Sequence, residues 1–471
     1  MVFNSATFAA FFVVVFAAAW LLRGRLALRH TLLLAASYVF YGHWSPKFLL
    51  LIVGSTVLDY CLGLAMEATR SQQKRKLYVI ASLCGNLGVL GFFKYFNFFT
   101  HEAVALLNAM GFAAHEPTLS IALPVGISFY TFQTLSYTID VYRGKLEVEH
   151  NLLRFALFVA FFPQLVAGPI VRASHFLPQL RKAPSLNLEQ ARSGLYLMFW
   201  GLTKKVVIAD FLGATLVDAY WGAPGAELAG IGGLLAIYAY AFQIYGDFSG
   251  YSDMAIGAAR LLGYELGPNF DAPYRAMNPS DFWRRWHISL SQWLRDYLYI
   301  PLGGNRKGPV RTYINLALTM LLGGLWHGAS WMFVIWGAFH GLMLIVHRLW
   351  SRGVEPDPAN LSFVQRAWRR VGFFQLTCIG WIFFRSVDLD QFVKVVWYLG
   401  EPTKWGQLGM LHVLVFALAI GSHFPRRATK DGWRLRFTHA HPALQGAVYA
   451  LVIGLAMNSA KLSQPFIYFQ F

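Results

Sequence analysis

The sequence predicts an all-α integral membrane protein that crosses the bilayer many times. Of its 471 residues, 56% are hydrophobic and 13% are charged, whereas a soluble globular chain is about 25% charged. Long apolar segments alternate with short clusters of Arg and Lys along the whole length. Aromatic residues make up 17% of the chain, which suits many helix ends at the two bilayer interfaces.

Membrane topology also explains the net charge of +17. Such a charge on a soluble chain would suggest nucleic acid, but here the basic residues lie between apolar segments, as in cytoplasmic loops that face anionic lipid. We therefore expect membrane lipids and no nucleic acid as partners. The loops predicted to be cytoplasmic are residues 23–29, 70–76, 143–145, 172–182, 284–311, 348–370 and 426–436.

The apolar segments follow one another in a single domain, residues 1–471. Basic residues follow the first segment, residues 5–22, which is the reverse of a secretory signal and predicts a retained helix with its N-terminus outside. Pro163 interrupts residues 151–167, so a re-entrant or interfacial element fits there better than a span. The remaining spans are expected at residues 31–42, 48–66, 77–96, 121–140, 191–209, 229–247, 312–326, 331–346, 371–384, 407–422 and 443–459. Roughly ten to twelve spans result, with a C-terminus outside.

The most informative feature is His327, which lies in sequence that is otherwise apolar from Thr312 to Val346. An ionisable group inside a span is costly and indicates a functional site, and imidazole moves protons near neutral pH. A histidine that only hydrogen-bonds two helices together is the simpler alternative. Three glycines favour function, because they let backbone and substrate approach the imidazole: Gly323, Gly324 and Gly328.

The lengths of the neighbouring segments predict the depth of His327. Residues 312–326 cover about 22 Å as a helix, which is short of the roughly 30 Å hydrocarbon core. The turn that carries His327 should therefore lie within the membrane, where its backbone must line a protein cavity or a water-filled funnel.

Residues 279–301 are predicted to form an amphipathic helix in or near the cytoplasmic interface, with Ser280 as its N-cap. Arg284 and Arg285 are then available to lipid headgroups or to an anionic acyl donor. An ordinary interfacial helix explains the arginines more simply, but His287 is harder to explain in that way.

Asp247 and Asp253 form a polar end to the 229–247 span. They could line an acceptor path, although capping of a helix end is the commoner role of Asp. The three cysteines are scattered without a CxxC spacing, which predicts buried packing thiols and no metal site; they are Cys61, Cys84 and Cys378.

Two segments resemble the signatures of the membrane-bound O-acyltransferase superfamily. They are residues 283–291 with 293–297, and residues 325–328 with 336–341. Residues 161–170, 245–253 and 465–471 are similar to the bacterial alginate O-acetyltransferase branch of that superfamily.

The resemblance implies transfer of an acetyl group from a cytoplasmic thioester, with acetyl-CoA as the expected donor and no bound cofactor. The acceptor hydroxyl would belong to an exported polysaccharide such as alginate, reached from the bacterial inner membrane through a periplasmic acetyltransferase partner. The superfamily's catalytic histidine corresponds to His327, and its second motif histidine, which we expect to bind or orient the donor, to His287. His340 and Trp326 are expected beside the site, with a structural role favoured for His340.

Two alternatives to this function remain open. One is D-alanyl transfer within the same superfamily, and the other is a transporter or flippase without covalent chemistry. Against the transporter, the sequence contains neither an internal repeat nor paired broken helices.

The aromatic residues 466–471 contain Tyr468. An aromatic belt at the membrane boundary is the usual explanation of such a run. By resemblance to acyl-export systems of the superfamily, Tyr468 is instead expected to enter the funnel and relay the acetyl group through its phenolic oxygen.

Overall fold

The structure of the chain is a computed structural model that describes residues 1–115, 119, 121–166, 168–185, 187–351, 357 and 360–467, except for the side chains of residues 460 and 461. Nearly all of its elements are helices. Two short strands, β1 (Leu228–Ala229) and β2 (Lys404–Trp405), pair antiparallel, with Leu228 opposite Trp405. The predicted all-α class is confirmed.

The chain forms two compact units, one of residues 1–187 with 259–266 and the other of residues 188–258 with 267–471. The single integral-membrane domain over residues 1–471 stays a prediction.

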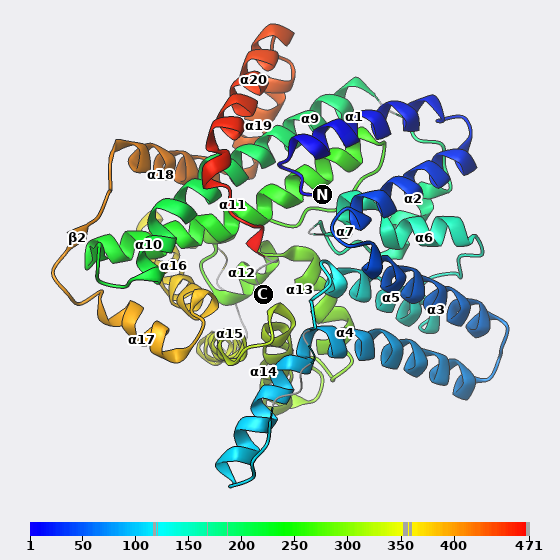
Figure 1. Cartoon of the computed structure of the whole chain (residues 1–471), viewed down its shortest axis with the longest axis horizontal. Coiled ribbons are helices and arrows are strands. Elements are labelled where there is room, and N and C mark those ends of the chain that lie inside the picture. Colours follow the sequence, from blue (N-terminus) through cyan, green and yellow to red (C-terminus); the bar gives the residue numbers. More distant parts are fainter. Residues whose placement is uncertain are drawn as a thin grey trace. The chain divides into compact units, whose positions relative to one another are not determined.

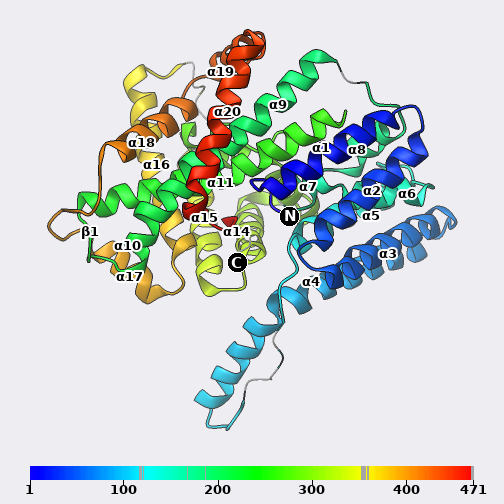
Figure 2. The same ribbon diagram turned by 45° about the horizontal axis from the view of Figure 1, so that its top comes forward.

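The first unit begins with long helices that pack in succession (Figures 1 and 2). They are α1 (Ala6–Leu21), α2 (Leu26–Gly42), η1 (Pro46–Phe48), α3 (Leu49–Glu67), α4 (Gln72–Ala109) and α5 (Ile127–Tyr142). Ser5 caps α1 and Ser71 caps α4 through their side chains. Inside the unit, the buried carboxylate of Asp59 on α3 accepts hydrogen bonds from Ser82, from Asn86 at 2.8 Å and from Thr138 at 2.9 Å, and so ties α3, α4 and α5 together.

Short helices complete this unit: α6 (Leu152–Ala160), α7 (Phe162–Leu165) and α8 (Ala173–Leu180). The break predicted around Pro163 is confirmed, because α6 ends at Ala160 and the proline stands in the first turn of α7, where its missing N–H costs nothing. Before α6, Glu149 accepts hydrogen bonds from Arg154 at 2.7 Å and from Arg181 of the segment after α8 at 3.2 Å.

The second unit contains α9 (Leu188–Thr203), the π-helical turns η2 (Lys204–Asp210) and η3 (Gly213–Val217), α10 (Asp218–Gly222) and most of α11 (Ile231–Leu261). Next come η4 (Pro273–Arg275), α12 (Pro279–Arg285), α13 (Ile288–Leu294) and the π-helical turn η5 (Arg295–Tyr299). The remaining helices are α14 (Gly308–His327), α15 (Trp331–Trp350), α16 (Phe363–Arg385), α17 (Leu389–Trp397), α18 (Met410–His423), α19 (Arg427–Thr438), α20 (Pro442–Asn458) and η7 (Ser459–Leu462).

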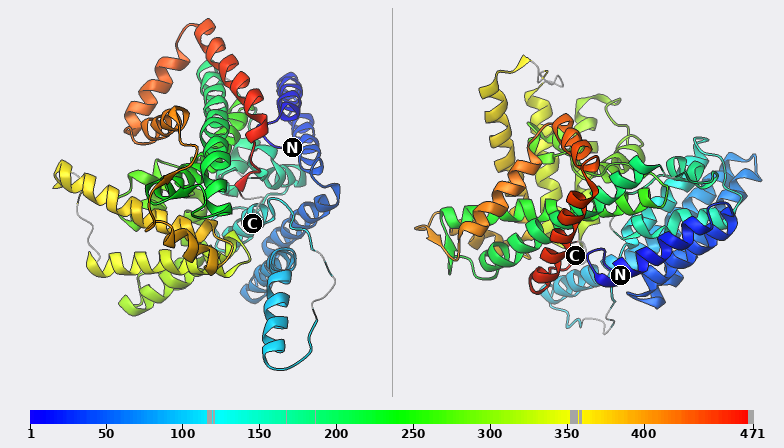
Figure 3. Two further views of the ribbon diagram at one scale, coloured as in Figure 1. Left: turned by 60° about the vertical axis from the view of Figure 1, so that its left-hand side comes forward. Right: turned by 90° about the horizontal axis from the view of Figure 1, so that it is seen from above.

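The predicted spans coincide with helices, although several helices are longer than predicted. Among the described residues, three helical stretches are long and apolar enough to cross a membrane, namely Pro46–Glu67, Gln72–Ala109 and Trp331–Trp350. A fourth is added if α19 and α20, which are bent by 110° at their junction (Figure 3), form one span. The count of ten to twelve spans stays a prediction.

Helices α14 and α15 pack almost backbone to backbone (Figure 1). A Cβ atom on Gly324 would lie 2.3 Å from the carbonyl oxygen of Phe333 and 3.0 Å from the Cα atom of Gly337. Small residues permit such close helix crossings in membranes. Gly324 therefore serves helix packing, whereas the sequence suggested room for a substrate.

Candidate active site

His327 is the last residue of α14, and its imidazole is only 3% exposed. The chain then turns at Gly328, and Ser330 caps α15 by accepting a hydrogen bond from the backbone of Met332. The imidazole lies 4.9 Å from the ring of Trp336 and 5.3 Å from that of Phe384, between ring centres, with both rings nearly perpendicular to it. The predicted burial of His327 is confirmed, and the funnel above it stays a prediction.

Three histidines and two tryptophans form a continuous row of rings. His287 contacts Trp326 at 5.9 Å, Trp326 contacts His327 at 5.1 Å, His327 contacts Trp336 at 4.9 Å, and Trp336 contacts His340 at 4.6 Å, all between ring centres. Segments α12–α13, α14 and α15 each supply part of this row. The structure thus brings together four predicted site residues, and Trp326 touches both motif histidines.

His287 interrupts the amphipathic helix predicted for this region. Its φ of +41° is in the left-handed region, which a residue with a side chain adopts at an energetic cost and which clusters at functional sites. The N-cap is Asn278, which accepts a hydrogen bond from the backbone of Asp281, and not Ser280 as predicted. Phe282, Trp286 and His287 are all at most 1% exposed, so this side of the segment packs inside the protein; the interfacial position stays a prediction.

Asn269 determines which nitrogen of His287 carries the proton. The backbone N–H of Ser289 faces Oδ1 of Asn269 at 3.3 Å and can only donate, so that atom must be the amide oxygen. Nδ1 of His287 lies 3.1 Å from the same oxygen and must therefore donate as well. Burial lowers the pKa of His287 to about 3, so the ring is neutral and Nε2 carries its lone pair.

His340 is enclosed by aromatic rings. Trp283 lies 5.1 Å from it and Phe282 stacks on it at 6.0 Å, between ring centres. The imidazole is 1% exposed, and among the described residues neither of its nitrogens has a hydrogen-bond partner. A buried polar ring without partners is costly, so packing alone does not account for His340.

The two arginines before His287 differ. Arg285 is committed to carboxylates within the unit, at 2.8 Å from Asp281 and 3.5 Å from Asp271. Arg284 is exposed. A donor-binding role for either arginine stays a prediction.

Asp247 and Asp253 do not cap a helix. Helix α11 continues to Leu261, so both residues lie inside it. Neighbouring lysines of the π-helical turn η2 pair with them: Lys204 with Asp253 and Lys205 with Asp247, each at 2.7 Å. Lys205 also pairs with Asp210 at 2.7 Å. Since Lys205, Asp210 and Asp247 are at most 3% exposed, they form a buried ionic cluster, which we call the Lys205 cluster.

The Lys205 cluster holds the chain at residues 464–467. Asp247 accepts a hydrogen bond from the backbone N–H of Ile467 at 2.6 Å, and Lys205 donates to the carbonyl oxygen of Gln464 at 2.8 Å. The Gln464 side chain donates to Asp218 at 3.0 Å. Phe466 and Ile467, at 2% and 4% exposed, therefore lie in the protein interior, while Pro465 is exposed.

The same segment reaches the neighbourhood of His287. Phe466 is 2% exposed and lies 4.4 Å from Tyr251 and 6.0 Å from Phe248, and Phe248 lies 4.6 Å from His287, all between ring centres. Tyr468 follows directly after Ile467 but lies outside the described residues.

Sequence reasoning missed the Lys205 cluster and Asn269. The lysines at positions 204 and 205 within a predicted span, with Asp210 directly after it, were a usable signal, because charges at membrane depth usually pair. Asn269 carried no comparable signal. The cysteine prediction was wrong in part, since only Cys378 is buried and Cys61 and Cys84 are exposed.

The fold and the site define a helical membrane protein with histidines buried among its apolar helices, which is a class suited to proton-linked chemistry inside the bilayer. A sequence profile of the membrane-bound O-acyltransferase family matches residues 144–379. That range contains all three histidines of the ring row.

Curated relatives cover most of the chain. The probable alginate O-acetylase AlgI of Pseudomonas aeruginosa is 44% identical over 442 residues, which are 91% of this chain and 82% of the relative. The protein of the same name from Pseudomonas putida is 38% identical and is matched over the whole length of both chains. The peptidoglycan O-acetyltransferase of Helicobacter pylori is 36% identical over 92% of this chain and 84% of the relative. This chain belongs to the membrane-bound O-acyltransferase family and is an acyltransferase.

Proposed function

We propose that this acyltransferase moves an acetyl group from acetyl-CoA on the cytoplasmic side to a hydroxyl of an exported polysaccharide, with His327 as the general base. The observation that carries the proposal is the ring row, which places the buried His327 and the neutral His287 on either side of Trp326. The names of the relatives support acetyl as the group and a polysaccharide such as alginate as the acceptor.

In the proposed reaction, His327 accepts the proton of the attacking hydroxyl as its oxygen bonds to the thioester carbonyl carbon. The tetrahedral intermediate then expels the thiolate, the carbon–sulfur bond breaks, and His327 returns the proton to sulfur. The products are an O-acetyl ester and the free thiol of coenzyme A. A base in hydrogen-bond reach contributes about 10²–10⁴-fold to such a step.

His287 is proposed to orient the donor and not to act as a second base. A neutral imidazole whose Nδ1 is held by Asn269 keeps one ring orientation. Fixed groups of this kind lower the entropic barrier of a bimolecular reaction.

We further propose that Tyr468 relays the acetyl group. Its phenolic oxygen would attack the thioester, with His327 taking the phenolic proton, and the resulting O-acetyl tyrosine would pass its acetyl group to a nucleophile of a periplasmic acetyltransferase. A phenol of pKa near 10 needs such a base to react at neutral pH. Support for the relay comes from the hydrogen bonds between the Lys205 cluster and residues 464–467 and from the burial of Phe466 and Ile467.

The deciding experiment presents acetyl-CoA, labelled in its acetyl group, to the cytoplasmic face of membranes that contain the protein and its acceptor. An acetyltransferase leaves covalent label on the acceptor, whereas a flippase leaves none. A parallel assay with D-alanyl thioester tests the other transfer reaction, and label from that donor alone would replace acetyl as the proposed group.

Substitution of His327 tests the proposed base. We expect His327→Ala to lower transfer by about 10²-fold or more, while His347→Ala, on the neighbouring helix α15, retains activity. Both variants should remain monodisperse after purification. Near-normal transfer by a well-folded His327→Ala protein would refute the assignment.

A further inference from the structure

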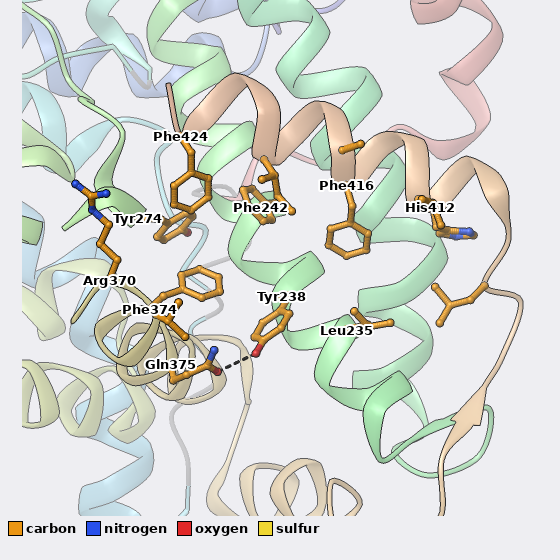
Figure 4. A pocket seen from close by; sticks show the side chains of 15 residues that line it. Leu235, Tyr238, Phe242, Tyr274, Arg370, Phe374, Gln375, His412, Phe416 and Phe424 are labelled. Atoms are coloured by element: carbon orange, nitrogen blue, oxygen red, sulfur yellow. Dashed lines mark hydrogen bonds between the residues drawn. The ribbon is translucent and has the colours of Figure 1, made fainter. Parts of the chain in front are cut away.

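An apolar groove of about 620 Å³ lies in the second unit between helices α11, α16 and α18 (Figure 4). Hydrocarbon and aromatic side chains form nearly all of its wall. The Tyr238 hydroxyl donates to Gln375 at 3.0 Å across α11 and α16, which satisfies two of the few polar groups there. The remaining lining therefore suits an apolar ligand.

The groove is about as long as one bilayer leaflet is thick. It runs along α18 from His412 at one end to Phe424 near the other (Figure 4). The distance from residue 412 to residue 424 along a helix is about 18 Å, whereas half of the hydrocarbon core is roughly 15 Å. A single acyl chain that extends through one leaflet would fit this length.

Positive charge gathers at the Phe424 end. Arg370 lines the groove there (Figure 4). Nη1 of Arg275 donates to the carbonyl oxygen of Pro425 at 2.9 Å, and Arg426 follows Pro425 in the chain. Burial, and then the guanidinium groups of Arg370 and Arg285, lower the pKa of Arg275, which shows that these cations lie within electrostatic reach of one another.

Among the described residues, these arginines form no direct ion pair, although Asp271 acts on Arg275 and Asp281 on Arg370 from a longer distance. Within the described part of the chain, no carboxylate lies within ion-pair distance of Arg275, Arg370 or Arg426, and Nε of Arg370 is buried without a hydrogen-bond partner. Arg285, in contrast, is paired with Asp281 and Asp271. Positive charges that lie together without directly paired carboxylates create a site for an anion.

We propose that the groove binds one anionic phospholipid, with an acyl chain along α18 and the headgroup phosphate at Arg370 and Arg275. An apolar channel of leaflet length that ends in unpaired arginines complements a ligand with a hydrocarbon chain and one phosphate. Arg370 and Arg426 belong to segments predicted to be cytoplasmic, and the cytoplasmic leaflet is the one rich in anionic lipid.

Native mass spectrometry of the detergent-purified protein, titrated with phosphatidylglycerol or phosphatidylcholine, tests the proposal. We expect one phosphatidylglycerol to be retained in preference to phosphatidylcholine, and Arg370→Gln to weaken its retention about tenfold. Arg369→Gln is the matched control, because this exposed arginine neighbours Arg370 on α16 but does not line the groove. The Arg369→Gln protein should retain phosphatidylglycerol as the unaltered protein does.

A second variant tests the acyl-chain part without changing charge. Ala417 lines the groove on α18, so Ala417→Trp should fill the channel and abolish retention while all arginines remain. Equal retention by Ala417→Trp would refute the acyl-chain site and indicate lipid held by surface charge only. Displacement of the lipid by acetyl-CoA would assign the arginines to the donor's phosphates and would also overturn the proposal.

Discussion

Asp247 and Asp253 are alike in sequence context and in pairing with a neighbouring lysine, but only Asp247 also accepts a hydrogen bond from residues 464–467. One side chain thus connects a buried cation to the backbone of a segment 220 residues away in sequence. Removal of one partner from a buried ionic group is strongly destabilising, at about 3–5 kcal/mol. A comparison of Asp247 with Asp253 therefore separates the hydrogen bond to residues 464–467 from the effect of a lysine–carboxylate pair alone.

We predict that Asp247→Asn loosens residues 464–467, whereas Asp253→Asn does not. The measurement is the rate at which a thiol reagent modifies Ile467→Cys in each background. It should rise about tenfold or more in Asp247→Asn only. Protein without the added cysteine corrects for the exposed Cys61 and Cys84. Equal rates in the two backgrounds would show that the Lys205 cluster does not hold the segment.

Tyr468→Phe separates relay from docking, because it removes only the phenolic oxygen. We predict that the variant releases thiol from acetyl-CoA only slowly and leaves the exported polymer unacetylated. Ester analysis of the polymer measures this. Normal O-acetylation would rule out the relay and leave the aromatic segment a docking role.

At the scale of elements, the crossing of α14 and α15 positions His327. A methyl group on Gly324 cannot be accommodated without separating the helices, because it would lie 2.3 Å from a backbone oxygen. We predict that Gly324→Ala lowers stability by about 1–3 kcal/mol, seen as a lower Tm, and also lowers transfer. Gly372→Ala on α16 is the control, since nothing lies within 4 Å of its added Cβ. An unchanged Tm for Gly324→Ala would contradict this packing.

Helices were predictable here because their boundaries follow hydropathy, as for α1, α15 and α18. The division of one predicted helix into α12 and α13 was not, because the left-handed backbone of His287 is accompanied by hydrogen bonds that residues 287–289 donate to the distant Asn269. For the same reason the partners of Asp247 escaped prediction: no local pattern records which lysine of another helix will face a carboxylate. The identity of the histidines was predictable, and their arrangement along two tryptophans was not.

At the scale of the whole molecule, sidedness follows from the basic loops. Ser45 and Ser71 flank η1 and α3, and the 19 residues of α3 span about 28 Å, close to the roughly 30 Å hydrocarbon core. In intact cells, an impermeant thiol reagent should modify Ser45→Cys and spare Ser71→Cys. The unsubstituted protein is the control that measures labelling of the native cysteines. The opposite pattern would invert the predicted topology.

In the π-helical turn η2, charge pairing depends on the helix type and the residue spacing as well as on which residues are charged. A π-helical turn contains one residue more than an α-helical turn. Lys205 and Asp210 are five residues apart, so on an α-helix they would stand about 140° apart around the axis. The hydrogen bonds of the π-helical turn, from residue i to residue i+5, instead bring both side chains onto one face, where Lys205 pairs with Asp210 and with Asp247. Deletion of one residue between them would restore α-helical geometry, and the resulting spacing of four residues would keep the two charges on one face. A gap of one position in this stretch would thus change the helix type and preserve the ion pair.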